Sequence, residues 1–218
     1  MPKAKKEVEP PPRIPDKEFQ LFLPEQHTGG ISICMIGSTR SGKTTIMKST
    51  LRRYFDEHLA VLMSPSIHAP VYADLDKNIC KAPDYVPEIL REMYAINRKV
   101  DNHYKFLCIL DDVVTKKFDK ELLKLFTIYR NTGISGIMSI QSPILLNSAM
   151  RGNLNVVMLG FMNSSESCER VIRMFCYSNI EGKNIEEKVE TYKRLTADHF
   201  WIVIDNLEGT IYRTKIRL

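Results

Sequence analysis

Residues 31–44 read ISICMIGSTRSGKT, and this stretch decides the fold. From Gly37 to Thr44 it matches the pattern G-x-x-x-x-G-K-[ST] at every position. An apolar run, Ile31–Ile36, precedes the pattern, and an amphipathic stretch, Thr44–Phe55, follows it. Glycine-rich loops between a strand and a helix wrap polyphosphates, because their backbone N–H groups approach closely and the helix N-terminus is positive. The sequence therefore predicts a nucleotide-binding loop formed by Gly37, Ser38, Thr39, Arg40, Ser41, Gly42, Lys43, Thr44 and Thr45.

Two side chains of this loop and two acids carry the predicted chemistry. Lys43 is expected to reach the β- and γ-phosphates of ATP and so to act in catalysis, and the Thr44 hydroxyl is expected to ligate Mg²⁺. The apolar run Phe106–Leu110 ends in a pair of acids, Asp111 and Asp112. We expect Asp111 to hold Mg²⁺, directly or through water. Asp112 is expected to polarise the attacking water; the alternative is that the pair consists of one magnesium ligand and one structural cap.

A polar residue also follows the apolar run Ile134–Ile140, and this residue is Gln141. If this strand lies beside the strand that leads into the glycine-rich loop, the Gln141 amide would contact both the γ-phosphate and the attacking water, because an amide donates and accepts hydrogen bonds. Gln141 is therefore a catalytic candidate. The alternative is a glutamine that caps the strand before Pro143.

The rest of the first three-quarters of the chain repeats this alternation. Strand-like apolar runs alternate with stretches of helical periodicity: the strands lie at Leu59–Met63, Phe106–Leu110, Ile134–Ile140 and Val156–Met162, and the helices at Val86–Lys99, Phe118–Arg130 and Pro143–Arg151. Uniformly apolar strands that alternate with helices indicate a parallel sheet buried on both faces. The predicted fold class is therefore α/β, with three layers and a central, mainly parallel β-sheet flanked by helices.

The last third of the chain has a different pattern. Two stretches, Glu166–Cys176 and Ile185–Arg194, have helical periodicity, and two strands, Phe200–Asp205 and Thr210–Arg217, flank a turn at residues 206–209 that predicts a hairpin. We expect three parts: a flexible tail rich in proline and charge over residues 1–18, a core over residues 19–162, and C-terminal helices and a β-hairpin over residues 163–218 that pack on the core.

The composition excludes several classes of protein. Hydrophobic residues make up 44% and charged residues 26% of the 218 residues, which rules out wholesale disorder. The longest apolar runs are too short to span a membrane, and no secretory signal is recognisable, so neither a membrane nor secretion is expected. The cysteines, an odd number without a C-x-x-C pair, predict reduced and mostly buried thiols: Cys34, Cys80, Cys108, Cys168 and Cys176.

The charge permits a polyanionic partner without requiring one. Lysine and arginine number 31 against 26 acids, which gives a formal net charge of +5. Three basic clusters could make sequence-independent contact with double-stranded DNA. One lies within residues 37–55, and the other two contain the candidates Lys116, Lys117, Lys120, Arg213 and Lys215. A solvated surface is the alternative for each cluster.

A longer stretch carries a resemblance to a known family. Residues 130–143, RNTGISGIMSIQSP, resemble the R-x-x-G-I, apolar strand and Q-x-P run of the FtsK/HerA superfamily of P-loop ATPases. The Asp111-Asp112 ending and the chain length are similar to those of the genome-packaging ATPases of poxviruses, other large double-stranded DNA viruses and virophages, whereas bacterial members usually carry Asp-Glu. Arg151-Gly152-Asn153 also resembles the R-x-N of that viral group. The resemblance covers residues 31–162.

The resemblance implies a P-loop NTPase fold and an ATP- and Mg²⁺-dependent motor that translocates double-stranded DNA into a viral capsid. It implies a homo-oligomeric ring, hexameric or pentameric, with ATP at the subunit interfaces, and a capsid or vertex protein as a further partner. Virion assembly sites in the host cytoplasm, or the virion itself, would be its location. An arginine from the neighbouring subunit would complete each site, and the candidates are Arg151, which we prefer because it lies past the Gln141 strand, and Arg130. At the end of a helix, Arg130 would also offset the helix dipole without any catalysis.

Two other functions remain open from the residues alone. A nucleotide-gated assembly module would bind ATP without motor activity, although the paired acids disfavour it. A small-molecule kinase would use the same loop, but it needs an acceptor pocket and an arginine-rich lid, and the sequence shows no obvious lid.

Overall fold

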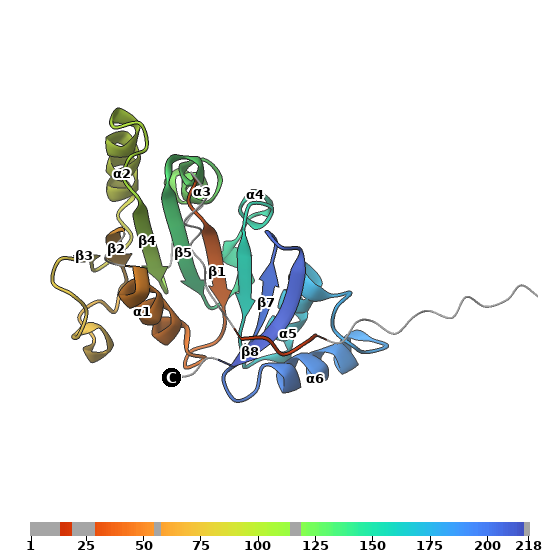
Figure 1. Ribbon diagram of the computed structural model, residues 1–218. Helices are drawn as coiled ribbons and strands as arrows, with labels where there is room; N and C mark the ends of the chain where they lie inside the picture. Colours follow the sequence, from red (N-terminus) through yellow and green to blue (C-terminus); the bar gives the residue numbers. More distant parts are fainter. Residues whose placement is uncertain (1–13, 19–28, 55–57, 114–118, 216–218) are drawn as a thin grey trace, which may run out of the picture.

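The computed structural model describes residues 14–18, 29–54, 58–113 and 119–215 (Figure 1). Within them the strands form one eight-stranded sheet in the order β3-β2-β4-β5-β1-β6-β7-β8. Their bounds are β1 Ser32–Ile36, β2 Leu59–Met63, β3 Cys80–Ala82, β4 Phe106–Asp111, β5 Ile134–Ile140, β6 Val156–Leu159, β7 Phe200–Asp205 and β8 Thr210–Lys215. All pairs from β3 to β6 are parallel, whereas β7 is antiparallel to both of its neighbours. The predicted α/β class with a mainly parallel sheet is confirmed.

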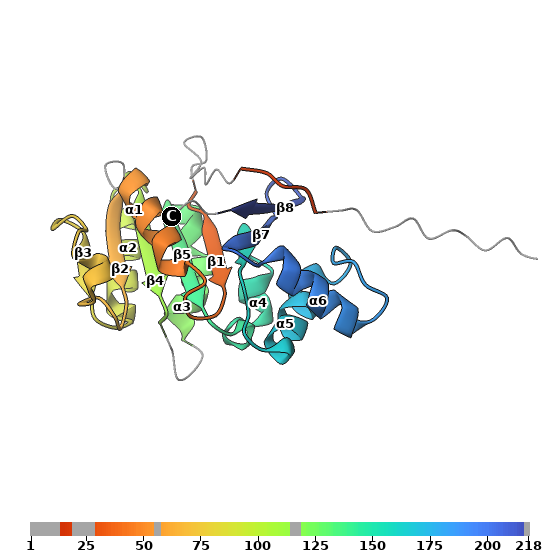
Figure 2. The same ribbon diagram turned by 90° about the horizontal axis from the view of Figure 1, so that it is seen from below.

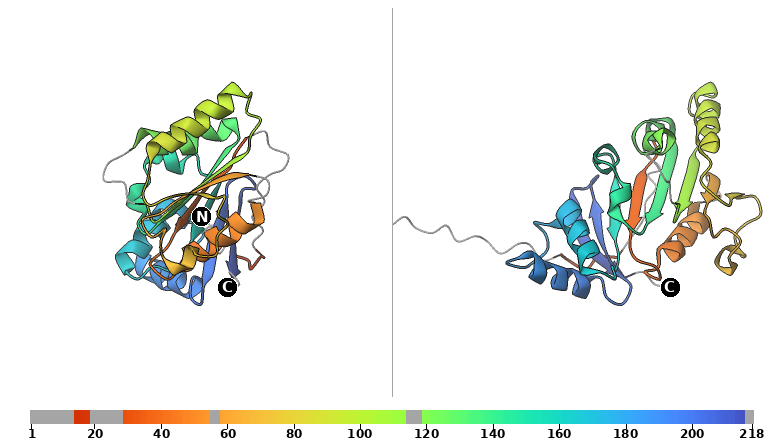
Figure 3. Two further views of the ribbon diagram at one scale, coloured as in Figure 1. Left: turned by 90° about the vertical axis from the view of Figure 1, so that its left-hand side faces the viewer. Right: turned by 180° about the vertical axis from the view of Figure 1, so that it is seen from behind.

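Helices cover both faces of this sheet, and their bounds are α1 Lys43–Tyr54, α2 Pro87–Lys99, α3 Lys120–Thr127, α4 Ser148–Arg151, α5 Ser165–Val171 and α6 Ile185–Leu195. Successive side chains of a strand point to opposite faces, so the sheet separates two apolar cores. Cys34 and Ile36 of β1 join the core under α2 to α6, whereas Ile33 and Met35 join the core under α1. Figure 2 shows α1 on one side of the sheet and α4 to α6 on the other, and the left view of Figure 3 shows the twisted strands between α1 and α2.

The boundaries of several elements differ from the prediction. The helix predicted at Phe118–Arg130 begins at Lys120, where Asp119 accepts hydrogen bonds from the first backbone N–H groups, and it ends at Thr127 before a 3₁₀ turn, η3 (Tyr129–Thr132). The predicted helix Pro143–Arg151 is two short pieces, η4 (Pro143–Leu145) and α4, because Leu146 and Asn147 are extended.

One further strand is shorter than expected, two short elements escaped the prediction, and one predicted helix changes type along its length. The strand predicted to reach Met162 ends at Leu159. Both β3 and a 3₁₀ turn, η2 (Pro70–Tyr72), are only three residues long, too short for a periodic signal. Helix α5 continues into a π-helical turn, η5 (Ile172–Cys176).

The C-terminal hairpin is part of the main sheet. Its first strand pairs with β6 along four register positions, from Val156 with Asp205 to Leu159 with Ile202. On the outer edge of the hairpin lie residues 14–18 of the predicted tail, where the Arg213 N–H donates to the Pro15 carbonyl at 2.7 Å. One sheet therefore runs through the predicted core and the predicted C-terminal part.

The cysteines are unpaired, as the sequence predicted, and all but Cys80 are buried. Burial raises the pKa of Cys108 and of Cys176 to about 12, so both stay protonated thiols at neutral pH. None of the helices in the described ranges is both long and apolar enough to cross a bilayer.

Candidate functional site

The glycine-rich loop leaves the carboxyl end of β1, a central strand between β5 and β6. Its start is anchored on both sides: the Gly37 N–H donates to the Ile140 carbonyl at 3.1 Å, and the Ser38 N–H donates to the Phe161 carbonyl at 2.9 Å. Gly42 has a φ of +98°, a conformation that glycine adopts without strain, and the next residue begins α1. The loop therefore presents its backbone at the N-terminus of a helix, as the sequence predicted.

Two polar side chains of the loop point into it. Lys43 is 5% exposed, and its Nζ donates to the carbonyls of Gly37 at 2.8 Å and Ser38 at 3.1 Å. The Ser41 hydroxyl is buried and has no hydrogen-bond partner within the described residues. A buried hydroxyl without a partner is costly, and a polyphosphate inside this loop would supply acceptors for it and for Lys43. These residues fit a nucleotide phosphate group.

Asp111 ends β4 beside the loop and is 2% exposed. Its Oδ2 accepts a hydrogen bond from the Thr44 hydroxyl at 2.8 Å, so the two residues predicted to hold Mg²⁺ are in contact. Hydroxyls of Tyr72 and Ser139 also donate to this carboxylate, to Oδ2 and Oδ1 respectively. Oxygen donors of this kind are the ligands that Mg²⁺ prefers, so the set fits that ion.

Sequence reasoning missed both additional donors to Asp111. Tyr72 lies in η2, in the segment between β2 and β3 that has no periodic pattern. Burial and the neighbouring Asp111 raise the pKa of Tyr72, so its hydroxyl keeps its proton and donates. Ser139 has a weak signal, because it is a polar residue within an apolar strand, two positions before Gln141.

Asp112 lies at the mouth of the site, with 38% of its side chain exposed. Its Oδ1 is 3.7 Å from Lys43 Nζ, and its backbone N–H donates to the Ser139 hydroxyl at 2.9 Å. The Gln141 amide donates to Asp112 Oδ2 at 3.4 Å. Asp112 has a φ of +51°, a left-handed conformation that is uncommon outside glycine and recurs at functional sites. The structure thus brings Lys43, Asp112 and Gln141 together as predicted, while their catalytic roles remain predictions.

The two candidate arginines lie near the amino ends of the strands, away from the loop of the same chain. Arg130 precedes β5, and its Nη1 donates to the Asn153 carbonyl and to Asn155 Oδ1, both at 3.2 Å. Arg151 ends α4, and its Nη1 donates to the Leu146 carbonyl at 2.6 Å. Figure 1 shows α4 at the opposite end of the sheet from the start of α1. Either arginine could therefore contact only the nucleotide bound to a neighbouring subunit. This role stays a prediction.

The basic residues predicted to contact DNA are differently placed. Lys116 and Lys117 lie outside the described residues, and Lys120 is exposed at the start of α3. Arg213 is engaged within the chain, since it makes a two-pronged ion pair with Asp16 at 2.6 and 2.9 Å and stacks over Phe200. Lys215 is exposed, with its Nζ 5.4 Å from the centre of the same ring. Lys120 and Lys215 are therefore the more accessible candidates.

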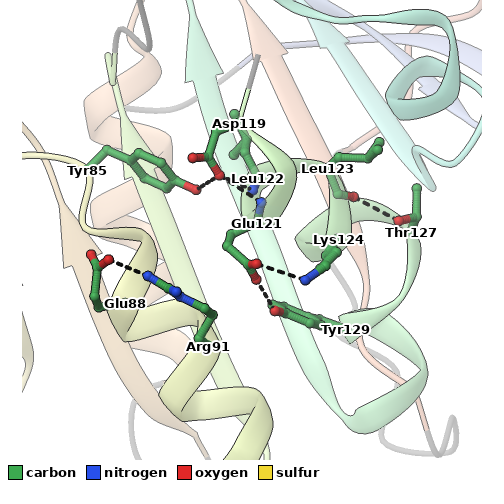
Figure 4. A network of polar contacts seen from close by, with 10 residues as sticks. All are labelled: Tyr85, Glu88, Arg91, Asp119, Glu121, Leu122, Leu123, Lys124, Thr127 and Tyr129. Carbon is green, nitrogen blue, oxygen red and sulfur yellow. Dashed lines mark hydrogen bonds and ion pairs between the residues drawn. The ribbon is translucent and has the colours of Figure 1, made fainter. Parts of the chain in front are cut away.

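A polar network fixes the helix that follows the two acids (Figure 4). Asp119 caps α3 by accepting from the Glu121 and Leu122 N–H groups, and it also accepts from the Tyr85 hydroxyl at 2.7 Å. Burial acts to raise the pKa of Asp119, but the hydrogen bonds from Tyr85 and the backbone outweigh it and lower that pKa. Tyr129 and Lys124 both donate to Glu121. The network joins the start of α2 to both ends of α3.

Comparisons with solved structures identify the fold. The genome-packaging NTPase B204 from Sulfolobus turreted icosahedral virus 2, solved with ATPγS, superposes with a TM-score of 0.62 at 13% identity, over 87% of this chain and 98% of that one. The conjugation coupling protein TcpA of pCW3, also solved with ATPγS, superposes with a TM-score of 0.62 at 13% identity, over 85% of this chain and 60% of that one. This is the fold of the P-loop NTPases. The predicted resemblance to viral genome-packaging ATPases is confirmed at the level of the fold, while no family model and no curated protein matches the chain.

Proposed function

We propose that this chain is an ATP-hydrolysing motor that translocates double-stranded DNA and packages a viral genome into a capsid. The observation that carries the proposal is the meeting of Lys43, Asp111, Asp112 and Gln141, from α1, β4 and the residue after β5, at one edge of the sheet. A loop that only binds nucleotide does not need a partly exposed carboxylate beside an amide at the γ-phosphate end. Hydrolysis does, because the water must be both oriented and relieved of a proton.

Each side chain of the site has a defined task in this proposal. The loop N–H groups and Lys43 would bind the phosphates of ATP, with Nζ leaving the Gly37 and Ser38 carbonyls for the β- and γ-phosphates. Thr44 and Asp111 would hold Mg²⁺, which supplies charge neutralisation at the phosphates. Asp112 would accept the proton of the attacking water, and Gln141 would orient that water through its bond to Asp112.

Assembly into a ring would complete the site. Arg151, or less favourably Arg130, would reach the nucleotide of the neighbouring subunit and stabilise the charge on the transferring phosphoryl group. Exposed apolar side chains follow β5 and β6 at the edge where the loop lies, which fits a surface covered by another subunit: Ile144, Leu145 and Phe161. Lys120 and Lys215 are candidates for contact with the DNA backbone.

The viral branch of the proposal rests on the acid pair and on the superposition with the B204 NTPase. The acids are Asp111 and Asp112 rather than Asp-Glu, and the chain superposes over nearly the whole length of the B204 NTPase but over only 60% of TcpA. A capsid or vertex protein is the further partner that packaging needs, and virion assembly sites or the virion would be the location.

The test measures phosphate release from ATP in the presence of Mg²⁺, with and without linear duplex DNA. The mass of the assembly is measured in parallel by light scattering. The proposal predicts DNA-stimulated release by an assembly of five or six subunits and its loss in Asp112→Asn. Asp198→Asn is the matched control, because Asp198 is also a left-handed aspartate, with a φ of +53°, but is exposed and lies before β7. An assembled ring that binds ATP but releases no phosphate would indicate the assembly module, and phosphate transfer to a nucleoside would indicate a kinase.

A further inference from the structure

The only tryptophan of the chain lies directly beside the start of the phosphate-binding loop. Trp201 is on β7, in the hairpin, and is completely buried in the core under α1. A Cβ atom on Gly37, the first residue of the loop, would lie 3.3 Å from Trp201 Cη2. A Cβ atom on Gly160 would lie 2.7 Å from Cη2 and 2.8 Å from Cζ2 of the same ring. The outer edge of the indole therefore fills the space that Gly160 leaves open, and it shares the space beside Gly37 with the Ser41 side chain, whose Oγ would lie 2.7 Å from that Cβ.

Gly160 is itself part of the support of the loop. Its N–H donates to the Ile36 carbonyl at 2.8 Å, one residue before the loop begins. Its carbonyl accepts from the Tyr192 hydroxyl of α6 at 2.7 Å. The residues that follow also bind the loop, since the Asn163 N–H donates to the Ser38 hydroxyl oxygen at 2.9 Å. Residues 160–163 and Trp201 of β7 thus lie against Gly37 and Ser38, while α6 bonds Gly160.

These two loop residues matter because their carbonyls hold Lys43. A displacement of Gly37 would change both the curve of the loop backbone and the starting position of the Lys43 ammonium. The indole contributes shape and apolar area to this contact, because its Nε1 is buried without a hydrogen-bond partner within the described ranges. A rigid aromatic ring packed against backbone resists such displacement, since protein interiors are close-packed.

We infer that Trp201 is a positioning residue for the nucleotide site. The C-terminal helices and hairpin support the phosphate-binding loop in its conformation. The inference rests on the proposed nucleotide binding and gives residues 160–203 a task in it. Trp201 acts through Gly37 and touches no nucleotide. This packing also depends on Gly160, because the absence of a side chain at that residue leaves room for the indole ring.

The experiment uses a size exchange between residues 160 and 201, with binding of ATPγS and Mg²⁺ measured by calorimetry. In Gly160→Ala the new methyl group would lie within 3 Å of the indole, so the ring beside Gly37 must move. We expect affinity to fall about tenfold or more, because small misplacements of a binding element are costly. Trp201→Phe removes the outer edge of the ring. In the double variant the methyl group therefore has room, and affinity should return to that of Trp201→Phe alone.

Gly136→Ala is the matched control. A Cβ there would lie 2.9 Å from Leu125 Cγ, so this variant also crowds a buried side chain, but on β5 under α3. We expect a lower melting temperature with an affinity within about twofold of wild type, because the site is separate from the loop. Emission from Trp201 reports whether the ring has moved, and it should shift in Gly160→Ala but not in Gly136→Ala.

The outcomes separate the inference from the proposed function. If Gly160→Ala folds, shifts the tryptophan emission and still binds ATPγS as wild type does, the inference is wrong while the proposed function stands. Failure of Trp201→Phe to rescue Gly160→Ala contradicts it equally. If the wild-type chain binds no ATPγS, the proposed function is wrong, and the positioning role falls with it.

Discussion

The two ends of the parallel strands are built from similar residues, but their polar groups differ in how completely they are hydrogen-bonded. At the amino end, Ser32 and Asn155 bond each other through backbone and side chain. The Ser32 N–H and hydroxyl both donate to Asn155 Oδ1 at 2.9 Å, and the Asn155 N–H donates to the Ser32 hydroxyl at 3.0 Å and to the Ser32 carbonyl at 2.9 Å. At the carboxyl end, Ser41 Oγ and Asp112 Oδ1 are buried without a hydrogen bond from any described residue.

Left-handed backbone occurs at both ends and does not separate them. Arg40, with a φ of +67°, and Asp112, with a φ of +51°, lie at the carboxyl end, whereas Asp101 and Asn102, with φ of +50° and +60°, lie before β4 at the amino end. Natural proteins pair nearly all buried polar groups, and unpaired ones concentrate where a ligand completes them. The comparison teaches that the amino end holds the sheet together, while the carboxyl end is arranged for a ligand.

The largest expected effect comes from Lys43→Ala at the carboxyl end. Loss of the ammonium removes the charge that faces the phosphates, so phosphate release should fall about 1,000-fold or more. The melting temperature should stay close to that of wild type, because Lys43 bonds only loop carbonyls and Asp112. Lys77→Ala, an exposed lysine before β3, is the control. Loss of cooperative unfolding in Lys43→Ala would place this lysine in the core and not in the site.

Asn97→Ala tests the amino end. Asn97 is completely buried on α2; its amide donates to the carbonyls of Tyr104 and Thr132 and accepts from the Tyr104 N–H. Leaving these groups unpaired should cost about 3 kcal/mol of unfolding free energy in urea. Turnover per folded molecule should not change. Asn131→Ala, an exposed residue of η3, should leave both quantities unchanged, and an unaltered midpoint in Asn97→Ala would refute the contrast between the ends.

Tyr72→Phe sharpens the comparison inside the site. The variant deletes one donor to Asp111 and keeps the buried ring, so the carboxylate loses one of its three hydroxyl contacts. We expect turnover to fall about tenfold, with more Mg²⁺ needed for half-maximal rate, because positioning of a magnesium-holding group tunes its affinity. Phosphate release is measured across a magnesium titration.

Tyr85→Phe is the matched control for that variant, because it also removes a tyrosine–carboxylate hydrogen bond, at Asp119. Both variants should lose about 1 kcal/mol of stability, but only Tyr72→Phe should change turnover. Equal magnesium curves for the two variants would remove Tyr72 from the site.

The smallest effect concerns the cap of α3. Asp119→Ala should lower the unfolding free energy at pH 7 by about 1 kcal/mol. The pKa of Asp119 is lowered in the folded chain, so its stabilising contribution is present above the ordinary aspartate pKa and is lost as the pH falls through the folded value. The difference between wild type and variant in urea unfolding should therefore shrink as the pH is lowered below the ordinary aspartate pKa. A constant difference would show that the carboxylate charge plays no part in the cap.

The sequence predicted the elements with strong local patterns. The strands at Leu59–Met63 and Ile134–Ile140 have the predicted bounds, and the loop from Gly37 to Thr44 has the predicted setting, because a glycine pattern and an apolar run are local signals. Contacts between distant segments were not predictable in this way. Tyr72 meets Asp111 only because the chain between β2 and β3 returns across the sheet edge.

The place of the C-terminal hairpin also had no local signal. Its two strands and the turn between them form as predicted, but no residue pattern in Phe200–Asp205 indicates that β6 is the strand with which it pairs. Trp201 therefore looked like an ordinary core residue until the sheet brought it beside Gly37. The Asp16–Arg213 ion pair, which joins residues far apart in the sequence, was hidden for the same reason.

A triplex-displacement assay is the decisive measurement. A third strand, a triplex-forming oligonucleotide, is bound to linear duplex DNA, and its release reports movement along the DNA and not hydrolysis alone. The assembled chain should release the triplex-forming oligonucleotide when ATP and Mg²⁺ are added, and release should stop in Lys43→Ala and with ATPγS. Phosphate release by an assembled, DNA-bound ring without any displacement of the third strand would contradict the motor.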